Sequence, residues 1–183
     1  GGNTLVFFDS ATPGSTTSLG VSGVGSELLL GIDYRPADGQ LYGITSTGVF
    51  TIDSSGNAAR VNTFTTTFDG GTTSGVDFNP AADALRIVGA NGQNFGIGMG
   101  GRATTGVQIP LAYAAGDPNA TANPTITAAA YTNSFAGPAG TLASPRATQL
   151  YDIDSALNVL VLQNPPGSGT LTTIGNLGVN VGT

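Results

Sequence analysis

The residues best suited to chemistry in this chain are aspartates that recur within a repeated sequence. Asp33 and Asp77 lie 44 residues apart, and each is followed by an aromatic residue, a polar residue and a proline. Two carboxylates that meet across a cleft can act as an acid and a base in glycoside cleavage. An aspartate before a turn more commonly accepts backbone N–H groups and fixes the turn. We expect this structural role, and we keep an Asp-dependent, glycan-active enzyme as the alternative, with Asp152 and Asp154 as further candidates.

A second set of oxygen ligands lies in the loop from residue 117 to residue 123. Side-chain oxygens occur at every second position, which is the spacing of the first ligands in a calcium loop. The four candidates are Asp117, Asn119, Thr121 and Asn123. Only one of them is a carboxylate, and the central glycine and closing glutamate of a calcium loop are missing. We therefore expect no cofactor and at most a weak calcium site, and a calcium-stabilised adhesion module is a further alternative.

The composition excludes several classes of chemistry. The 183 residues contain no histidine and no cysteine, so zinc sites built from these residues and histidine-dependent triads are not available. Five basic residues stand against eleven acidic ones, for a net charge of −6. Nucleic-acid binding needs clustered Lys and Arg, so we do not expect it. No apolar run reaches the roughly 18 residues of a transmembrane segment.

The repeat that carries the aspartates organises the chain. Residues 31–44 and 75–88 share one pattern: a small residue, a β-branched residue, Asp, an aromatic residue, a polar residue, Pro, a polar turn and a second apolar run. The equivalent positions are Pro36 and Pro80, the aromatic residues Tyr34 and Phe78 and, in a weaker third copy, Tyr131. Such a pattern with a period of about 40 to 50 residues is typical of β-propeller blades. We expect the three aromatic side chains to pack between successive units.

The whole chain predicts a single all-β domain of antiparallel, four-stranded, β-propeller-like repeats. About three and a half units follow one another, over residues 4–21 (half a unit), 27–64, 74–113 and 125–177. The glycine-rich run 96–101 predicts a weak edge or a mobile hairpin, because glycine weakens the interior of a strand. A ring needs about four to eight blades. Either the protein continues beyond Thr183, or the array stays open or closes by other means.

Several blocks of the sequence resemble an uncharacterised bacterial family, a domain of unknown function in exported, repeat-containing, β-propeller-like proteins. The blocks are residues 30–43, 75–80 with 85–88, 111–119, 151–155 and 163–166. Residues 96–108 depart from the family pattern, in which a regular strand is expected. The family has no established activity, so the resemblance implies the fold and export but no catalytic residues.

We therefore expect a non-enzymatic, extracytoplasmic module in the periplasm or at the cell surface. A composition rich in Thr, Ser, Asn and Gly, with no Lys, favours export. We expect a structural or interaction role as an accessory part of a larger cell-envelope or surface assembly. A protein partner, such as a membrane-anchored assembly, is expected because open sheet edges favour pairing with another chain.

Overall fold

The computed structural model describes residues 3–99, 106–137 and 146–182, and these residues form an all-β structure. In this part of the chain there is no α-helix, and a short 3-10 turn, η1 (Pro166–Ser168), lies near the C-terminus. The sequence predicted antiparallel sheets of about four strands, and this prediction is confirmed.

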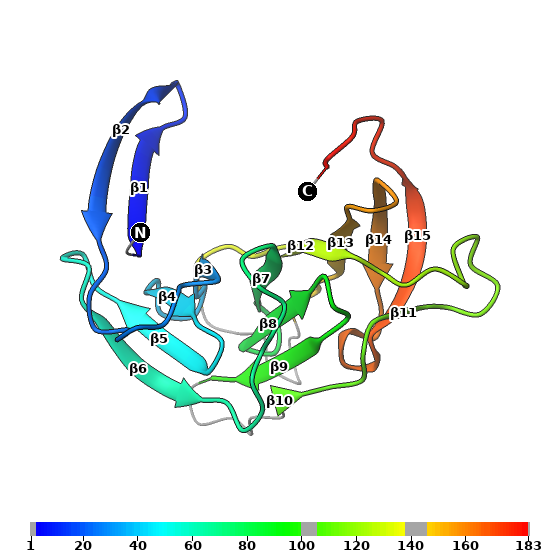
Figure 1. Cartoon of the computed structure of the whole chain (residues 1–183), viewed down its shortest axis with the longest axis horizontal. Coiled ribbons are helices and arrows are strands. Elements are labelled where there is room, and N and C mark those ends of the chain that lie inside the picture. Colours follow the sequence, from blue (N-terminus) through cyan, green and yellow to red (C-terminus); the bar gives the residue numbers. More distant parts are fainter. Residues whose placement is uncertain (1–2, 100–105, 138–145, 183) are drawn as a thin grey trace.

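Four sheets follow one another along the chain (Figure 1). The first is a hairpin of β1 (Thr4–Asp9) and β2 (Thr12–Gly20). We call the next three sheets units 1, 2 and 3. Unit 1 contains β3 (Gly31–Tyr34), β4 (Leu41–Ile44), β5 (Gly48–Ile52) and β6 (Ala58–Thr63). Unit 2 contains β7 (Ser74–Asn79), β8 (Ala84–Gly89), β9 (Asn94–Gly98) and β10 (Gly106–Val107). Unit 3 contains β12 (Ile126–Tyr131), β13 (Leu150–Asp154), β14 (Val159–Gln163), β15 (Thr170–Asn176) and β11 (Ala112–Tyr113), which pairs in parallel with β15.

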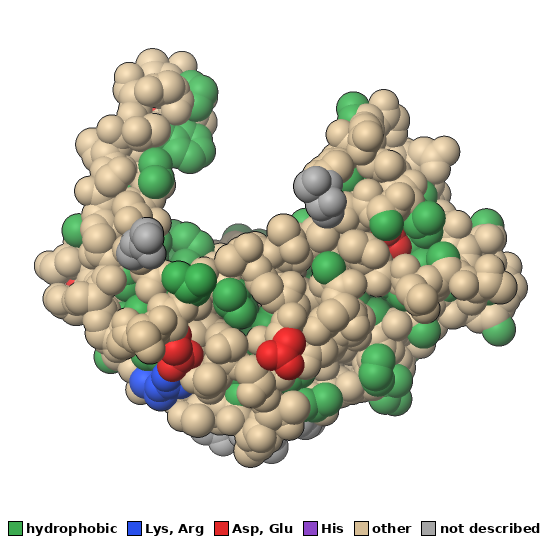
Figure 2. Space-filling model, in the orientation of Figure 1, with side chains coloured by type: hydrophobic (Ala, Val, Ile, Leu, Met, Phe, Trp, Pro, Cys, Tyr) green, Lys and Arg blue, Asp and Glu red, His purple; other side chains and the backbone are tan. Residues whose placement is uncertain are grey.

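The units lie along an open arc (Figure 1). The first strands of the units, β3, β7 and β12, lie on the inner side of the arc, and β6, β10 and β15 lie on its outer side. The hairpin stands away from the body at one end of the arc (Figure 1), and a hollow separates it from the C-terminal segment at the other end (Figure 2). Unit 2 therefore has one face toward unit 1 and the other toward unit 3.

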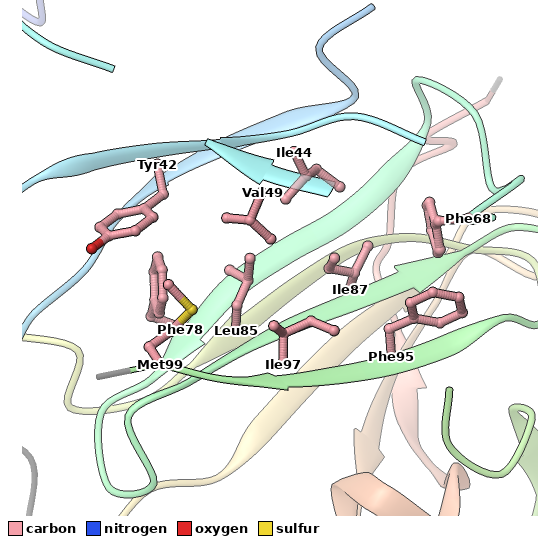
Figure 3. Close-up of a cluster of buried hydrophobic side chains, with 10 residues drawn as sticks. All are labelled: Tyr42, Ile44, Val49, Phe68, Phe78, Leu85, Ile87, Phe95, Ile97 and Met99. Carbon is pink, nitrogen blue, oxygen red and sulfur yellow. The ribbon is translucent and has the colours of Figure 1, made fainter. Parts of the chain in front are cut away.

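Apolar side chains fill the interfaces between the units. Because side chains alternate between the two faces of a strand, every second residue of each sheet points into one interface. Units 1 and 2 meet in the cluster shown in Figure 3, where the rings of Tyr42 and Phe78 lie edge to face at 5.1 Å. Its other members are Ile44, Val49, Phe68, Leu85, Ile87, Phe95, Ile97 and Met99. Units 2 and 3 meet in a second cluster, of Val88, Leu111, Tyr113, Ile126, Val159, Val161 and Leu171.

The glycine-rich run does not form a weak edge, and this prediction is wrong for the described residues 96–99. β9 lies between β8 and β10 in the sheet and is almost completely buried. Gly96 permits a close approach, because a Cβ atom there would lie 2.7 Å from the side-chain nitrogen of Gln108. Residues 100–101 lie outside the described residues. The sequence assigned residues 74–113 to one unit, and this boundary is wrong, because β10 and β11 within that range belong to different sheets.

The repeated aromatic residues do not share one environment. Phe78 is fully buried and Tyr131 is 6% exposed, as expected for side chains between units. Tyr34 is 60% exposed, so the expectation of core packing is wrong at this position. Phe78 packs on residues of the preceding unit, whereas Tyr34 faces a groove because only the hairpin precedes unit 1.

This difference predicts unequal effects of two equivalent substitutions. Phe78→Ala should lower the free energy of unfolding by about 3 to 5 kcal/mol, because it opens a cavity in the core. Tyr34→Ala is the matched control, and it should change stability by less than about 0.5 kcal/mol because the side chain is exposed. Urea denaturation of both variants measures the difference. Equal destabilisation would contradict the assignment of Tyr34 to an uncovered face.

Candidate functional site

The two repeated aspartates join the inner strands of successive units. Asp33 on β3 accepts a hydrogen bond from the backbone N–H of Phe78 on β7 at 2.8 Å. Asp77 on β7 accepts a hydrogen bond from the backbone N–H of Tyr131 on β12. Each carboxylate therefore pairs with the aromatic position of the next unit, whereas the sequence suggested that it would fix its own turn. Ala130 occupies the corresponding position in unit 3.

The carboxyl groups of Asp33 and Asp77 also interact with each other. Burial raises the pKa of Asp77 well above its ordinary value, and the adjacent Asp33 carboxyl raises this pKa further. Neighbouring carboxyl groups occur in acid/base enzymes, but here both accept backbone N–H groups, and Asp33 accepts a second one from Tyr34 at 2.7 Å. The cavities described below are lined by other residues. Both carboxyl groups are therefore engaged in hydrogen bonds to backbone N–H groups of the inner strands.

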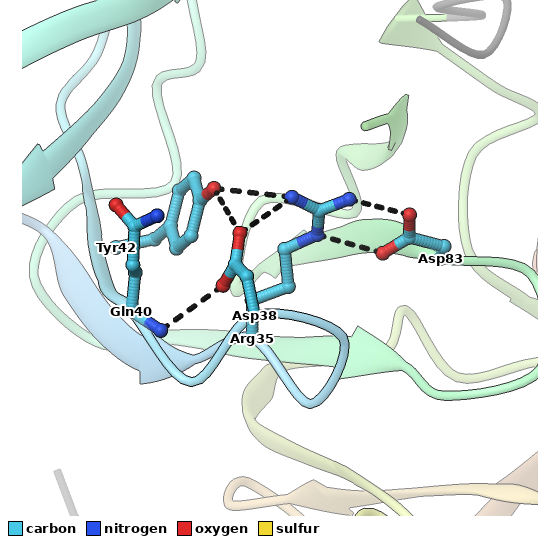
Figure 4. A network of polar contacts seen from close by, with 5 residues as sticks. All are labelled: Arg35, Asp38, Gln40, Tyr42 and Asp83. Atoms are coloured by element: carbon cyan, nitrogen blue, oxygen red, sulfur yellow. Dashed lines mark hydrogen bonds and ion pairs between the residues drawn. The ribbon is translucent and has the colours of Figure 1, made fainter. Parts of the chain in front are cut away.

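A network of ion pairs joins units 1 and 2 at their first turns (Figure 4). Arg35 donates two hydrogen bonds to the carboxylate of Asp83, at 2.7 and 2.5 Å, and a third to Asp38 at 2.6 Å. The hydroxyl of Tyr42 donates to the same Asp38 at 2.9 Å. The side chains of Arg35 and Asp83 are mostly buried, so this bidentate pair is less screened by solvent than a surface pair. The network fixes the turn of unit 1 against the turn of unit 2.

The repeated prolines stand at the start of these two turns. Pro80 is buried and Pro36 is half-buried. The carbonyl of Pro36 accepts a hydrogen bond from the backbone N–H of Gly137 at 2.8 Å. Both prolines are therefore at least partly buried residues of the turns.

The loop of residues 117–123, in which the sequence suggested a weak calcium site, is hydrogen-bonded to β15 of unit 3. Asp117 accepts hydrogen bonds from the backbone N–H and the hydroxyl of Thr173, at 2.7 and 2.8 Å, and from the backbone N–H of Asn119 at 2.8 Å. Both oxygens of this carboxylate thus hold the loop on β15. Thr121 and Asn123 are exposed further along the loop. In the described ranges, no three acidic side chains gather where they could hold a metal ion.

The other two candidate aspartates lie in different surroundings. Asp154 accepts hydrogen bonds from the hydroxyl of Tyr113 at 2.8 Å and from the backbone N–H of Ala156 at 3.1 Å. Asp152 is 1% exposed, and neither of its carboxyl oxygens has a hydrogen-bond partner among the described residues. Burial raises the pKa of Asp152 to about 8, although the charge of Arg86 acts in the opposite direction. The carboxyl group of Asp152 therefore holds its proton at neutral pH.

Asp152 belongs to a buried polar cluster between units 2 and 3 that the sequence did not predict. Arg86 is buried and donates hydrogen bonds to Asn94 and to Gln108, both at 2.6 Å. Gln163 is fully buried and donates to Asn94 at 3.3 Å. The only indication in the sequence was the presence of polar residues at positions where strand alternation calls for core residues.

The face of unit 1 that points toward the hairpin carries an apolar groove of about 590 Å³. Its lining includes Leu5 and Phe7 of β1, Tyr34 of β3, Leu41 of β4 and Ile52 of β5. Leu5, Leu41 and Ile52 form a small core that attaches the hairpin to unit 1. Phe7 and Tyr34 remain exposed. The hairpin thus covers only part of this apolar face.

β1 has an unpaired edge. One edge of the strand is bonded to β2 from Thr4 to Asp9, and no described strand pairs with the other edge. Val6, Phe7 and Phe8 are exposed, Phe8 by 62%. Hydrophobic side chains gather on the flank of the hairpin that faces the hollow (Figure 2). An exposed apolar edge strand is a template for pairing with another strand.

The residues from Thr4 to Thr183 match the family described as Domain of unknown function (DUF4394). The chain belongs to this family. The resemblance to a domain of unknown function is therefore confirmed, and the DUF4394 domain covers the hairpin and all three units. No curated protein matches the chain. None of the residues that the structure describes form a helix that is long and apolar enough to cross a membrane.

The bonds between inner strands predict the effect of removing a carboxylate. Asp77→Ala should destabilise the DUF4394 domain by about 1 to 3 kcal/mol, because the backbone N–H of Tyr131 loses its acceptor. Asp77→Asn keeps an acceptor oxygen without the charge, so it should retain most of the stability. Thermal melting of both variants measures the difference. Unchanged melting of Asp77→Ala would show that this bond is not structural.

The buried carboxyl of Asp152 predicts a pH dependence. An unfolded aspartate titrates at about 3.9, whereas the folded-state pKa of Asp152 is about 8. Its contribution to stability is therefore complete below about pH 4 and is lost as the pH rises through about 8. Asp152→Asn should reduce the fall in melting temperature between these pH values. Other groups titrate in the same range, so the quantity to measure is the difference in melting temperature between wild type and variant at each pH. A difference that does not change with pH would contradict the assignment of this pKa to Asp152.

Proposed function

We propose that the DUF4394 domain is a non-enzymatic, extracytoplasmic interaction module that accepts a β-strand of a partner protein at the free edge of β1. The observation that carries this proposal is the unpaired, apolar edge of β1 beside a groove that the hairpin covers only in part. Strand addition combines main-chain hydrogen bonds, which give affinity, with side-chain pockets, which give specificity. The free edge of β1 offers the main-chain groups, and the groove beside it offers a pocket for side chains.

The order of the strands indicates where a partner strand would lie. β6 is the outermost strand of unit 1 and leads to β7, the innermost strand of unit 2. β2 leads in the same way to β3, so the hairpin takes the two outer positions of a unit. The two inner positions are open in the described part of the chain. A strand added there would cover the exposed side chains of Ile32 and Tyr34.

The hydrogen bonds of the inner strands also favour a partner strand at the open inner positions beside the hairpin. The backbone N–H groups of Phe78 and Tyr131 each donate to an aspartate of the preceding unit. The backbone N–H of Tyr34 donates instead to its own neighbour, Asp33. A partner strand with an acceptor side chain at the equivalent position would give Tyr34 the same contact as the other two aromatic residues.

We further propose that the units are blades of a β-propeller-like array and that the partner completes the blade begun by the hairpin. Sheets that follow one another in an arc, with their first strands on the inner side, support this arrangement. A chain with a net charge of −6 is poorly suited to binding nucleic acid or anionic lipid. The proposed partner is therefore a protein of a cell-envelope or surface assembly. Fractionation of cells that produce the full-length protein tests the location, and recovery in the cytoplasm would contradict it.

The chain itself supplies a probe for strand addition. A peptide of residues 74–89 copies the inner pair β7 and β8, including Asp77. We expect this peptide to slow hydrogen exchange of the β1 amides and of Tyr34, because these groups gain hydrogen-bond partners. A peptide with the change Asp77→Ala should bind about tenfold more weakly, since one acceptor is removed.

Two variants of the domain provide the control. Phe7→Ser removes apolar lining from the groove and should weaken peptide binding. Ile109→Ser removes an exposed apolar side chain outside the groove, 61% exposed against 46% for Phe7, and should not affect binding. If the peptide protects no β1 amide, or if both variants behave alike, the edge of β1 is not a site for strand addition.

A further inference from the structure

The free edge of β1 carries a defined set of backbone hydrogen-bonding groups. In an antiparallel pair, every second residue exchanges bonds with the neighbouring strand and the residues between turn their backbone groups away from it. The carbonyl of Asn3 accepts a bond from the backbone N–H of Val21 at 2.8 Å, and the register with β2 stays regular through residue 8. Residues 3, 5 and 7 therefore bond to β2. The backbone groups of Thr4, Val6 and Phe8 point to the free edge.

The side chains of β1 divide between two faces of the hairpin. Leu5 is buried against unit 1, and Phe7 lines the groove beside it. Because side chains alternate along a strand, Val6 and Phe8 lie on the opposite face, where they are 54% and 62% exposed. Asp9, at the end of the strand, is the single charged residue in the sequence from residue 3 to residue 21. Both faces of β1 are thus mainly apolar, and the charge lies at one end.

A second copy of β1 is restricted in how it can pair with this edge. Two identical strands that pair antiparallel are related by a two-fold axis perpendicular to their sheet. Both copies then present the same face to the same side, and residues directly opposite each other share a face. The axis must therefore pass through a residue position and not between two positions. Near the middle of the strand, the axis can be centred on Leu5, Val6 or Phe7.

Hydrogen bonds and charge select the register centred on Val6. In this register Val6 lies opposite its own copy, and Thr4 lies opposite Phe8 in both directions, so that all three residues with free backbone groups are paired. The registers centred on Leu5 and Phe7 each leave one of these residues without a partner in β1. Centring on Phe7 also places the charge of Asp9 opposite Leu5, which is buried. With Val6 at the centre, Asp9 lies opposite residue 3, a neutral asparagine beyond the end of the strand.

The same register pairs the apolar side chains and separates the two bodies. On the groove face, Leu5 of each copy lies opposite Phe7 of the other, and on the other face the two copies of Val6 meet. Cross-strand apolar pairs of this kind stabilise a sheet. β1 begins at the body of the domain and ends at the tip of the hairpin (Figure 1). Antiparallel pairing therefore places the two bodies at opposite ends of the joined hairpins, where they do not collide.

We propose that the strand added at the free edge of β1 is β1 of a second copy of this chain, which joins two domains through a four-stranded sheet in the order β2–β1–β1–β2. This inference rests on the proposed function, because it names the partner at the same edge. The joint sheet has as many strands as units 1 and 2, and the second hairpin takes the two inner positions beside the first. A two-fold contact uses the same edge of both copies, so the complex stops at a dimer.

An introduced cysteine tests the register, because the chain contains no cysteine of its own. Val6→Cys places the two thiols at the axis, where the Cα atoms of a hydrogen-bonded pair lie about 5.5 Å apart, within the range that a disulfide spans. Phe8→Cys is the matched control, because its two copies are four positions apart along the strands, or about 14 Å. We expect mild oxidation to cross-link Val6→Cys and not Phe8→Cys. Failure of Val6→Cys to cross-link, or equal cross-linking of both variants, would overturn the proposal.

Sedimentation velocity of the intact domain measures the association itself. A contact of one strand is small, so we expect a micromolar Kd and a dimer that fills between about 1 and 300 µM. Val6→Lys and Val6→Glu should each be monomeric, because like charges meet at the axis, and an equimolar mixture of the two should dimerise again. Val61→Lys is the matched control, since Val61 on β6 is 48% exposed and lies outside β1, and it should dimerise like the wild type. A dimer that persists in Val6→Lys, or a mixture that stays monomeric, would overturn the proposal.

The peptide of residues 74–89 separates this inference from the proposed function. If the wild type is monomeric at every concentration and the peptide still protects the β1 amides, the second copy is not the partner but strand addition stands. If the wild type is monomeric and the peptide protects no β1 amide, both proposals are wrong. We expect the dimer to protect the amides of Thr4, Val6 and Phe8 from hydrogen exchange without added peptide, and Val6→Lys to lose this protection.

Discussion

The arrangement of the domain depends on one hydrogen bond that is repeated between units. A carboxylate on the inner strand of one unit accepts the backbone N–H of the aromatic residue on the inner strand of the next. Neighbouring inner strands belong to different sheets, so no sheet ladder joins them. The carboxylate fixes how far one sheet is shifted along the next, and the apolar side chains between the sheets then meet in a single register. Apolar contact alone is not directional and would not specify that shift.

The sequence indicated the parts of this contact, because both recur at the same spacing, but it did not predict the bond between units. The positions of Asp33 and Asp77 before an aromatic residue indicated a structural carboxylate, and the described strands fall within the predicted units, except that β11 joins the sheet of unit 3. Local patterns do not determine which strands become neighbours. Residues 106–113 look continuous in the sequence, yet a change of sheet divides them. Gly96 resembles a strand-weakening glycine, yet it lies in a buried strand, where the side chain of Gln108 occupies the space that a Cβ atom would need.

Long-range contacts also explain why the polar cluster was not predicted. Arg86 lies in a strand otherwise made of apolar residues, and its partners come from three other segments of the chain. Hydrogen-bond partners that are distant in the sequence leave no periodic pattern. Both interfaces combine apolar packing with polar contacts: the ion pair of Arg35 and Asp83 joins units 1 and 2, and this cluster joins units 2 and 3. Buried polar groups must find particular partners, so these contacts make both interfaces selective.

The pairing of β11 with unit 3 makes the two ends of the arc different. β11 pairs with the outer edge of β15, and farther along the same edge the backbone N–H of Thr173 is capped by Asp117. The segment that enters unit 3 thus covers the first part of the outer edge of β15, so a strand of another molecule cannot pair there. β1 at the opposite end of the arc has no such cover. Pairing at β1 therefore has no equivalent on this covered edge, and contact at two unlike ends favours a finite complex over the open-ended stacking of sheets that leads to fibres.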